Sequence, residues 1–148
     1  MDAKDLNKAA VLGAGTMGNG IAQVCAQAGM EVVLFDIAEE PLQKGLANID
    51  RMLAKAVERG KLEQADAAAV RARVSGATQL SEAVAGCDLV IEAVPEKLEL
   101  KQSVFREVEA AAPARAILAS NTSSLSIDKI AASLARPERF LGLHFFNP

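Results

Sequence analysis

Apolar runs of strand length alternate in this chain with segments of helical periodicity, and this alternation restricts the possible folds more than any other feature. The first apolar run, residues 9–12, is followed by a glycine-rich turn, Gly13-Ala-Gly-Thr-Met-Gly18, and then by a helical segment. Strand–helix–strand units of this kind form parallel sheets whose two faces are covered by helices. The sequence therefore predicts an α/β, Rossmann-type, doubly wound fold with a mostly parallel sheet of about six strands.

Six short apolar runs are the expected strands of this sheet. They cover residues 9–12, 32–35, 74–78, 88–94, 116–119 and 140–143. Helical patterns follow the first, fourth and fifth runs, and a longer helical insertion follows the second. Pro41 suits the first turn of the inserted helix and Gly60 its end. With a second, alanine-rich helix over about residues 63–73, the insertion is expected to form a helical hairpin.

The composition fits one compact domain, residues 1–148, in which 51% of the residues are apolar. The 16 basic and 19 acidic residues are spread without a Lys/Arg run, which argues against nucleic acid or an anionic membrane as a partner. No apolar run reaches the ~18 residues of a membrane span. The N-terminus resembles neither a secretory signal nor a transit peptide, so a cytoplasmic protein is expected.

The two cysteines are isolated from each other and from the single histidine. Cys25 and Cys87 lie in apolar stretches, and neither belongs to a Cys-x-x-Cys motif. Buried free thiols in a reducing compartment are therefore the expected state. A metal site is not expected, because the sequence supplies too few soft ligands.

Polar residues follow five of the six expected strands. In an open parallel sheet, ligands bind outside the carboxyl ends of the strands. The glycine turn follows the first strand and Asp36 the second. The later groups are Val94-Pro-Glu96, Ser120-Asn-Thr-Ser-Ser124 and the segment from His144 to Asn147. We therefore expect a binding site along this edge of the sheet.

The glycine turn matches the G-x-G-x-x-G pattern of dinucleotide-binding sites, and its position between a strand and a helix supports the match. Gly13 permits the tight turn, Gly15 has no Cβ to block a pyrophosphate, and Gly18 lets the helix lie close to the sheet. The N–H groups at the start of the helix favour a bound phosphate. The alternative interpretation is a glycine turn without a ligand.

The identity of the dinucleotide depends on Asp36, at the end of the second strand. Its carboxylate would accept hydrogen bonds from the adenosine ribose hydroxyls and would repel a 2′-phosphate. The residues that follow, Ile37 and Ala38, supply no arginine for such a phosphate. The sequence therefore predicts NAD as the cofactor in preference to NADP.

Four stretches of the chain resemble the NAD-binding domain of the L-3-hydroxyacyl-CoA dehydrogenases. They read VLGAGTMGNGIAQVCAQAG, DLVIEAVPEKLELKQSVF, ILASNTSSLSI and RPERFLGLHFFNP, and they run in the family's order from about residue 8 to the last residue. The subgroup that the chain resembles most is the short-chain 3-hydroxybutyryl-CoA dehydrogenases. The resemblance implies an oxidoreductase that interconverts (S)-3-hydroxyacyl-CoA and 3-oxoacyl-CoA by hydride transfer with NAD.

The resemblance also assigns roles to individual residues. His144 matches the catalytic histidine, a general acid and base, and Ser123 matches a serine near both the substrate and the nicotinamide. Together with the glycine turn, the predicted cofactor contacts are Gly13, Gly15, Thr16, Met17, Gly18, Asp36, Val94, Pro95, Glu96, Lys101, Ser123 and Asn147. The hairpin matches a part of the family that helps to hold coenzyme A, with Lys55, Arg59 and Lys61 as candidates for its phosphates.

Each of these residues also has a structural interpretation. A lone histidine at a strand end can be a hydrogen-bonded structural residue, and Ser123 can cap a helix. Glu96 can begin the helix after the fourth strand, and Lys101 can be a solvated lysine. Met17 can fill core space, and Asn147, before a proline, can be a turn residue.

The resemblance further implies that two parts of the family's enzyme lie beyond Pro148. One is a glutamate that orients the ring of His144, and the other is an all-helical domain for substrate binding and dimerisation. The chain is therefore expected to bind NAD(H) but to be catalytically incomplete, and the full-length enzyme is expected to be a homodimer. Two other functions stay open: a non-catalytic dinucleotide sensor, and a dehydrogenase of a hydroxy acid without coenzyme A.

Overall fold

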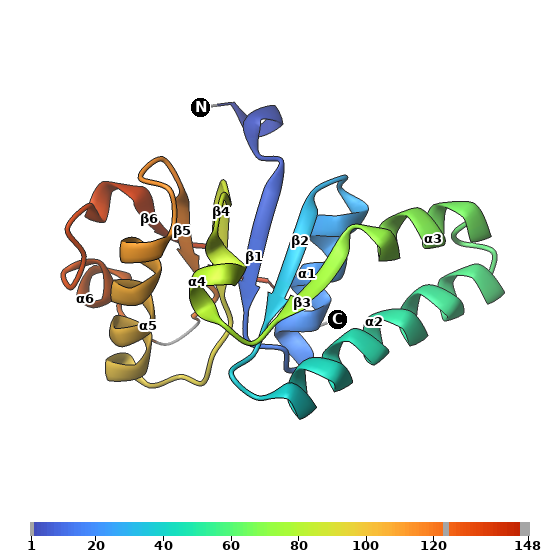
Figure 1. Cartoon of the computed structure of the whole chain (residues 1–148), viewed down its shortest axis with the longest axis horizontal. Helices are drawn as coiled ribbons and strands as arrows, with labels where there is room; N and C mark the ends of the chain where they lie inside the picture. Colours follow the sequence, from blue (N-terminus) through green and yellow to red (C-terminus); the bar gives the residue numbers. More distant parts are fainter. Residues whose placement is uncertain (1, 123–124, 146–148) are drawn as a thin grey trace.

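The fold is a parallel sheet with helices on both faces (Figure 1). The computed structural model describes residues 2–122 and 125–145. Within these residues the sheet has six strands in the order β3-β2-β1-β4-β5-β6, and every neighbouring pair is parallel. The strands are β1 (Lys8–Leu12), β2 (Glu31–Phe35), β3 (Val74–Ala77), β4 (Leu89–Glu92), β5 (Ile117–Ser120) and β6 (Phe140–Gly142). The predicted doubly wound sheet is confirmed.

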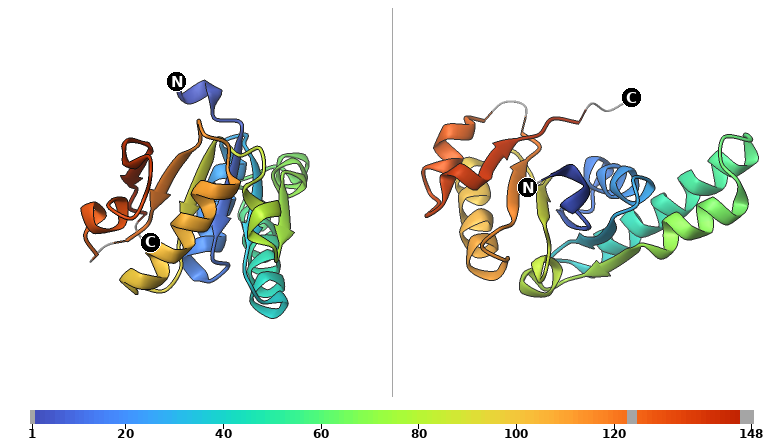
Figure 2. Two further views of the ribbon diagram at one scale, coloured as in Figure 1. Left: turned by 60° about the vertical axis from the view of Figure 1, so that its left-hand side comes forward. Right: turned by 90° about the horizontal axis from the view of Figure 1, so that it is seen from above.

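The helices form one layer on each side of the sheet, as the two views of Figure 2 show. They are α1 (Thr16–Gln27), α2 (Glu39–Glu58), α3 (Gln64–Ala72), α4 (Leu80–Val84), α5 (Leu98–Ala111) and α6 (Ile127–Ala131), with short 3₁₀ turns η1 (Ala3–Asp5) and η2 (Pro137–Arg139). Successive residues of β1 contact opposite layers. Val11 packs with α1 and the α2–α3 hairpin, whereas Ala10 and Leu12 pack with α4, α5 and α6. A strand buried on both faces explains why this run is continuously apolar.

The predicted hairpin is the α2–α3 pair, which projects beyond β3 to the right in Figure 1. Gly60, with a φ of +71°, follows the end of α2 and allows the chain to reverse. At its root the hairpin lies against the glycine turn, because a Cβ on Gly45 of α2 would come within 2.7 Å of the carbonyl oxygen of Ala14. This close approach places the hairpin beside the carboxyl edge of the sheet.

Two details of the fold differ from the sequence-based expectation. The short helix α4 was not predicted, because five residues are too few to show a helical period. The fourth strand was expected to run to Val94, but β4 ends at Glu92. There the backbone N–H of Val94 donates to the side-chain carboxylate of Glu92 at 2.7 Å, a bond that differs from the main-chain ladder of the sheet. Among the described residues, none of the helices has the length and apolar character that crossing a membrane requires.

Candidate functional site

The carboxyl ends of the strands, at the bottom of the sheet in Figure 1, carry most of the residues singled out in the sequence. Parallel pairing brings them to one edge: Leu12 is level with Phe35 of β2 and with Glu92 of β4, and Glu92 is level with Ser120 of β5. The glycine turn, Asp36, the loop after β4, the loop after β5 and His144 therefore begin at the same level. The predicted convergence at this edge is confirmed for the described residues.

The three glycines of the turn play different parts in the structure. Gly13 has a φ of +102°, and a Cβ there would lie 2.7 Å from the carbonyl oxygen of Ala93. A Cβ on Gly18 would lie 1.6 Å from the carbonyl oxygen of Gly13. Around Gly15, by contrast, a Cβ would meet no atom within 4 Å. The protein's own contacts thus require glycine at positions 13 and 18 and leave open space in front of position 15.

Asp36 is tied to the glycine turn. One carboxylate oxygen accepts a hydrogen bond from the backbone N–H of Ala14 at 3.2 Å, and the other accepts one from the N–H of Ala38 at the same distance. The residue is half-buried. Its carboxylate is therefore held at a set position beside the start of α1, and its remaining lone pairs can accept hydrogen bonds from a ligand's hydroxyls.

A second side chain that fixes the glycine turn was missed in the sequence. Asn19 is buried, and its amide donates to the carbonyl oxygen of Gly15 at 2.6 Å. Its side-chain oxygen accepts from Asn48 of α2 at 2.7 Å. This bridge joins the turn to the hairpin. The signal available in the sequence was a polar residue on the otherwise apolar face of the first helix.

A buried ion pair lies under the loop after β4. The ammonium nitrogen of Lys101, in the first turns of α5, lies 2.5 Å from a carboxylate oxygen of Glu92, and both side chains are 0% exposed. The other oxygen of Glu92 accepts from the hydroxyl of Ser120 at 2.5 Å. Lys101 also donates to the carbonyl oxygen of Val94 at 3.1 Å. Each charge is therefore surrounded by hydrogen-bond partners, which a buried pair requires.

Glu96 connects this buried pair to the surface of the site. One of its carboxylate oxygens lies 3.0 Å from the Lys101 ammonium, and its side chain is 40% exposed. The other oxygen accepts from the hydroxyl of Thr122 at 2.7 Å, and that hydroxyl accepts in turn from the N–H of Leu125. The loops after β4 and β5 are thus joined through side chains. Ser120 and Thr122 belong to the polar segment expected at this edge, but no individual role was predicted for them. Glu92 was not predicted as a site residue, although an acid inside an apolar strand was a visible signal for it.

The histidine follows β6 at the same edge. His144 is exposed, while its neighbours Leu143 and Phe145 pack partly buried against the apolar cluster that includes α1. The N–H of Leu143 donates to the carbonyl oxygen of Ser120 at 3.0 Å, and the N–H of Phe145 donates to the side-chain oxygen of Asn121 at 2.9 Å. The imidazole therefore lies on a short segment whose backbone is bonded on one side to Ser120, the last residue of β5, and on the other side to Asn121, the residue after it.

The other predicted residues are placed as follows. Thr16 and Pro95 are exposed, and Met17 and Val94 are half-buried, all near the carboxyl ends of the strands. Ser123 and Asn147 lie outside the described residues, so their predicted roles stay predictions. The candidates for coenzyme A phosphates, Lys55, Arg59 and Lys61, are exposed at the end of α2 and in the turn that leads to α3.

Both cysteines are free and buried, as predicted. Burial raises the pKa of the Cys87 thiol from 9.0 to about 11, and its Sγ lies 3.3 Å from the carbonyl oxygen of Ala83. Burial also raises the pKa of the Cys25 thiol. Neither thiol has the depressed pKa and exposure of a nucleophile.

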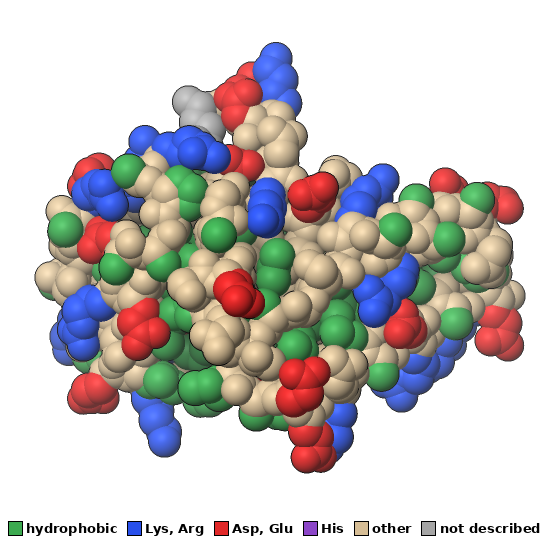
Figure 3. All heavy atoms as spheres, viewed as in Figure 1, with side chains coloured by type: hydrophobic (Ala, Val, Ile, Leu, Met, Phe, Trp, Pro, Cys, Tyr) green, Lys and Arg blue, Asp and Glu red, His purple; other side chains and the backbone are tan. Residues whose placement is uncertain are grey.

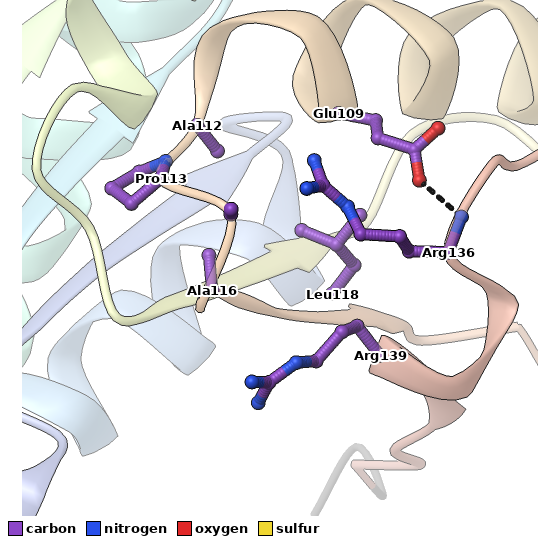
Figure 4. A pocket seen from close by; sticks show the side chains of 8 residues that line it. Glu109, Ala112, Pro113, Ala116, Leu118, Arg136 and Arg139 are labelled. Carbon is purple, nitrogen blue, oxygen red and sulfur yellow. Dashed lines mark hydrogen bonds between the residues drawn. The ribbon is translucent and has the colours of Figure 1, made fainter.

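Among the described residues, at least two hollows lie away from this edge. One, of about 10 Å³, is lined by Glu109, Arg136, Arg139 and the turn before β5, at the amino end of the strands (Figure 4). There the carboxylate of Glu109 accepts hydrogen bonds from the backbone N–H groups of Ala135 and Arg136. The other, of about 240 Å³, lies between α2 and α3. Acidic and basic side chains are interspersed over the face shown in Figure 3, with no extended patch of one sign.

Comparison with known proteins agrees with this geometry. Residues 8–148 match the family model described as 3-hydroxyacyl-CoA dehydrogenase, NAD binding domain. A 3-hydroxybutyryl-CoA dehydrogenase of Bradyrhizobium diazoefficiens is 45% identical over 97% of this chain and 48% of its own length. A fatty acid oxidation complex subunit alpha of Psychrobacter cryohalolentis is 44% identical over 99% of this chain and 20% of its own length.

The solved structures give the same result. The crystal structure of 3-hydroxybutyryl-CoA dehydrogenase from Escherichia coli superposes with a TM-score of 0.93 at 42% identity, over 97% of this chain and 30% of that chain. The chain thus spans about half the length or less of these relatives. The resemblance seen in the sequence is confirmed, and with it the assignment to an NAD-binding fold. This chain belongs to the family of 3-hydroxyacyl-CoA dehydrogenase NAD-binding domains.

Proposed function

We propose that the chain binds NAD(H) along the carboxyl edge of its sheet, as the cofactor domain of an enzyme that interconverts (S)-3-hydroxyacyl-CoA and 3-oxoacyl-CoA. The observation that carries this proposal is the difference among the glycines of the turn. Gly13 and Gly18 are required by the protein's own contacts, whereas the space in front of Gly15 is open. A diphosphate placed there would lie beside the N–H groups of the first turn of α1 and at the positive end of its dipole.

Asp36 is proposed to bind the adenosine ribose. Hydrogen bonds from Ala14 and Ala38 hold its carboxylate close to the turn that would carry the diphosphate. Two hydroxyls of an unmodified ribose can donate to a carboxylate. A 2′-phosphate in the same place would meet a negative charge, which supports NAD over NADP.

His144 is proposed to move the proton of the reaction. Bound NAD+ supplies the acceptor for the hydride that leaves the carbinol carbon of the substrate. The imidazole of His144 takes the hydroxyl proton in that direction and returns it to the carbonyl oxygen in reduction. Its exposure at the end of β6 leaves the ring accessible to a substrate, and Leu143 and Phe145 anchor the segment on either side.

Glu96 is proposed to contact the cofactor. Lys101 is proposed to act on the cofactor through Glu96. The Lys101 ammonium lies within 3.1 Å of oxygens of Glu92, Glu96 and Val94, and its side chain is 0% exposed. A lysine has three donors, so these three oxygens account for them. Glu96, at 40% exposure, is the member of the pair that faces the site.

The substrate and assembly form the remainder of the proposal. Lys55, Arg59 and Lys61 are exposed cations near the turn of the hairpin and could pair with the phosphates of coenzyme A. The relatives are two or more times as long as this chain. We therefore propose that a helical domain and a glutamate partner for His144 complete the site. As the resemblance in the sequence implies, we also propose that the complete enzyme is a homodimer. The N-terminal sequence supports the proposal that it is cytoplasmic.

Calorimetry and an assay of a longer protein test the proposal together. The chain should release or absorb heat with both NAD+ and NADH, and a protein that includes the sequence after Pro148 should oxidise NADH with acetoacetyl-CoA. In that protein His144→Gln should lower the rate by about 10²–10⁴-fold while NADH affinity changes little.

Three results would contradict parts of it. Absence of heat with either coenzyme on folded protein removes the cofactor proposal. Tight NADH binding without turnover by the longer protein favours the dinucleotide sensor. Turnover of a hydroxy acid that lacks coenzyme A, unaffected by changes at Lys55, Arg59 and Lys61, favours a dehydrogenase whose substrate does not carry coenzyme A.

A further inference from the structure

The side chain of Asn121 continues the hydrogen bonding of the sheet beyond its last backbone pair. The β5–β6 ladder pairs Ser120 with Gly142, and the N–H of Leu143 donates to the carbonyl oxygen of Ser120 at 3.0 Å. Two residues further along, the N–H of Phe145 donates to the side-chain oxygen of Asn121 at 2.9 Å. A side-chain amide thus takes the place of a main-chain carbonyl.

This bond and the preceding one attach the chain on both sides of His144. Leu143 and Phe145 are the residues that donate, and both have side chains packed against the apolar cluster with α1. His144 lies between them and is exposed. Two hydrogen bonds and two apolar contacts of its neighbours therefore restrain the position of its Cα, and the Asn121 bond is the one of these two hydrogen bonds that comes from a side chain.

Asn121 is itself held by the centre of the sheet. Its backbone N–H donates to the carbonyl oxygen of Glu92 at 2.9 Å. The carboxylate of Glu92 also binds the hydroxyl of Ser120, the residue before Asn121, and the ammonium of Lys101. Asn121 therefore joins Glu92 of β4, whose carboxylate belongs to the buried ion pair with Lys101 of α5, to the segment that carries the histidine.

We propose that Asn121 is a positioning residue for His144. Proton transfer in a site of this kind requires the reacting groups to be held within about 0.5 Å of their productive positions, which demands support from neighbouring hydrogen bonds. Without the Asn121 acceptor, the backbone at Phe145 loses this hydrogen bond, and the imidazole samples a wider range of positions. The functional consequence rests on the proposed function; the hydrogen bond itself does not.

The chain offers a direct readout, because His144 is its only histidine and gives a single Cε1–H signal in NMR spectra. Three variants are compared with the wild-type chain. Asn121→Ala removes the acceptor, Asn121→Asp keeps an acceptor oxygen, and Asn7→Ala removes an exposed amide at the opposite edge as a matched control. For each, amide hydrogen exchange of Phe145, the His144 signal with and without NADH, and NADH affinity are measured.

In Asn121→Ala the amide of Phe145 should exchange on the order of 10-fold faster, while that of Ile91 in β4 keeps its wild-type rate. NADH affinity should stay close to the wild-type value, but the shift of the His144 signal on NADH binding should shrink. Asn121→Asp should restore both the slow exchange of Phe145 and the NADH-induced shift. Asn7→Ala should match the wild-type chain throughout.

Several outcomes would overturn the proposal. Unchanged exchange of Phe145 in Asn121→Ala would show that the bond does not hold the segment, and equal acceleration at Ile91 would show that Asn121 serves the whole sheet. If Asn121→Ala does not fold, Asn121→Asp decides, since fast Phe145 exchange with an acceptor in place contradicts the proposal. A wild-type chain that binds no NADH would refute the proposed function, whereas exchange at Phe145 would still test the hydrogen bond.

Discussion

The ammonium nitrogen of Lys101 lies 2.5 Å from a carboxylate oxygen of Glu92, and neither side chain is exposed to solvent. The two residues come from different elements, α5 and β4, so the pair joins a helix to the centre of the sheet. Removing one partner of such a pair leaves a buried charge without its counter-ion, which is the costly case.

We expect each single substitution in this pair to destabilise the chain strongly. Lys101→Met should lower the free energy of unfolding by about 3–5 kcal/mol, and Glu92→Gln should lower it by less, because Glu96 still lies 3.0 Å from the ammonium group. The double variant should lose less than the sum of the two, because neither fully buried charge remains. Urea unfolding followed by circular dichroism measures all three. Lys44→Met, which breaks an exposed pair with Glu40, is the control and should cost under about 1 kcal/mol of stability. Losses that simply add in the Lys101/Glu92 double variant would contradict the energetic coupling of these two residues.

Three glycines of the first turn and helix should respond differently to alanine. Gly18→Ala should prevent stable folding, because its Cβ would overlap the carbonyl oxygen of Gly13. Gly15→Ala should fold normally but lose at least about 10-fold in NADH affinity, since its Cβ would enter the space proposed for the diphosphate. Gly20→Ala, also without a close neighbour, should gain about 0.5–1 kcal/mol of stability and keep its affinity. Thermal unfolding and calorimetry separate these cases, and unchanged affinity in Gly15→Ala would place the diphosphate elsewhere.

The preference between NAD and NADP should depend on Asp36. Asp36→Asn keeps an oxygen for a backbone N–H and removes the charge, so it should narrow the preference for NADH over NADPH by at least about 10-fold. Asp36→Ala should narrow it as well, with an added loss of stability from the unpaired N–H groups. Competition binding with the two reduced coenzymes measures the ratio. Asp66→Ala, an exposed acid in the first turn of α3, should leave it unchanged; an unaltered ratio in both Asp36 variants would refute the assignment.

Stability should fall in acid through Asp88, before β4. A hydrogen bond from the backbone N–H of Asn7 holds the pKa of the Asp88 carboxyl below 3.8, and the N–H of Lys8 and the Arg115 guanidinium act in the same direction against burial. Because the pKa of this carboxyl is lower in the folded chain than in the unfolded chain, its ionised form stabilises the fold. The stabilisation is complete at pH values above the unfolded-state pKa and is lost as the pH falls through the folded-state pKa. Asp88→Asn should therefore cost about 1–2 kcal/mol at pH 7 and progressively less at pH values below 3.8. Urea titrations over this range measure the difference, which Asp66→Asn should not show.

The thiols should be protected in the folded chain. A pKa of about 11 for Cys87 lowers its thiolate fraction about 100-fold relative to a thiol of pKa 9.0 at the same pH. In a Cys25→Ala variant, reaction of Cys87 with a disulfide reagent at pH 8 should be slower than in urea by at least this factor. Absorbance of the released thiol follows the rate. Rapid reaction of the native variant would show that Cys87 is accessible.

Much of the fold followed from the sequence because the relevant signals are local. The glycine turn between residues 9–12 and the first helix determines the conformation of its own backbone, and the apolar runs identify strands buried on both faces. Once the strands are parallel, their carboxyl ends must meet at one edge. The placement of Asp36 and His144 at the same edge therefore needed no knowledge of side-chain contacts.

The buried polar network depended on the tertiary structure. Lys101 by itself is typical of a solvated lysine, and it becomes buried only when β4, the loop after it and α5 assemble around its ammonium group. Glu92 and Asn121 likewise acquire their partners from segments far along the chain. The sequence alone determined the six strands, the longer helices and their order, because each follows from the conformational preferences and apolar period of a short segment, whereas the five residues of α4 are too few to show one. Only the folded chain decided which polar side chains share the interior, because a buried charge is tolerated where distant segments supply its counter-charge and hydrogen bonds.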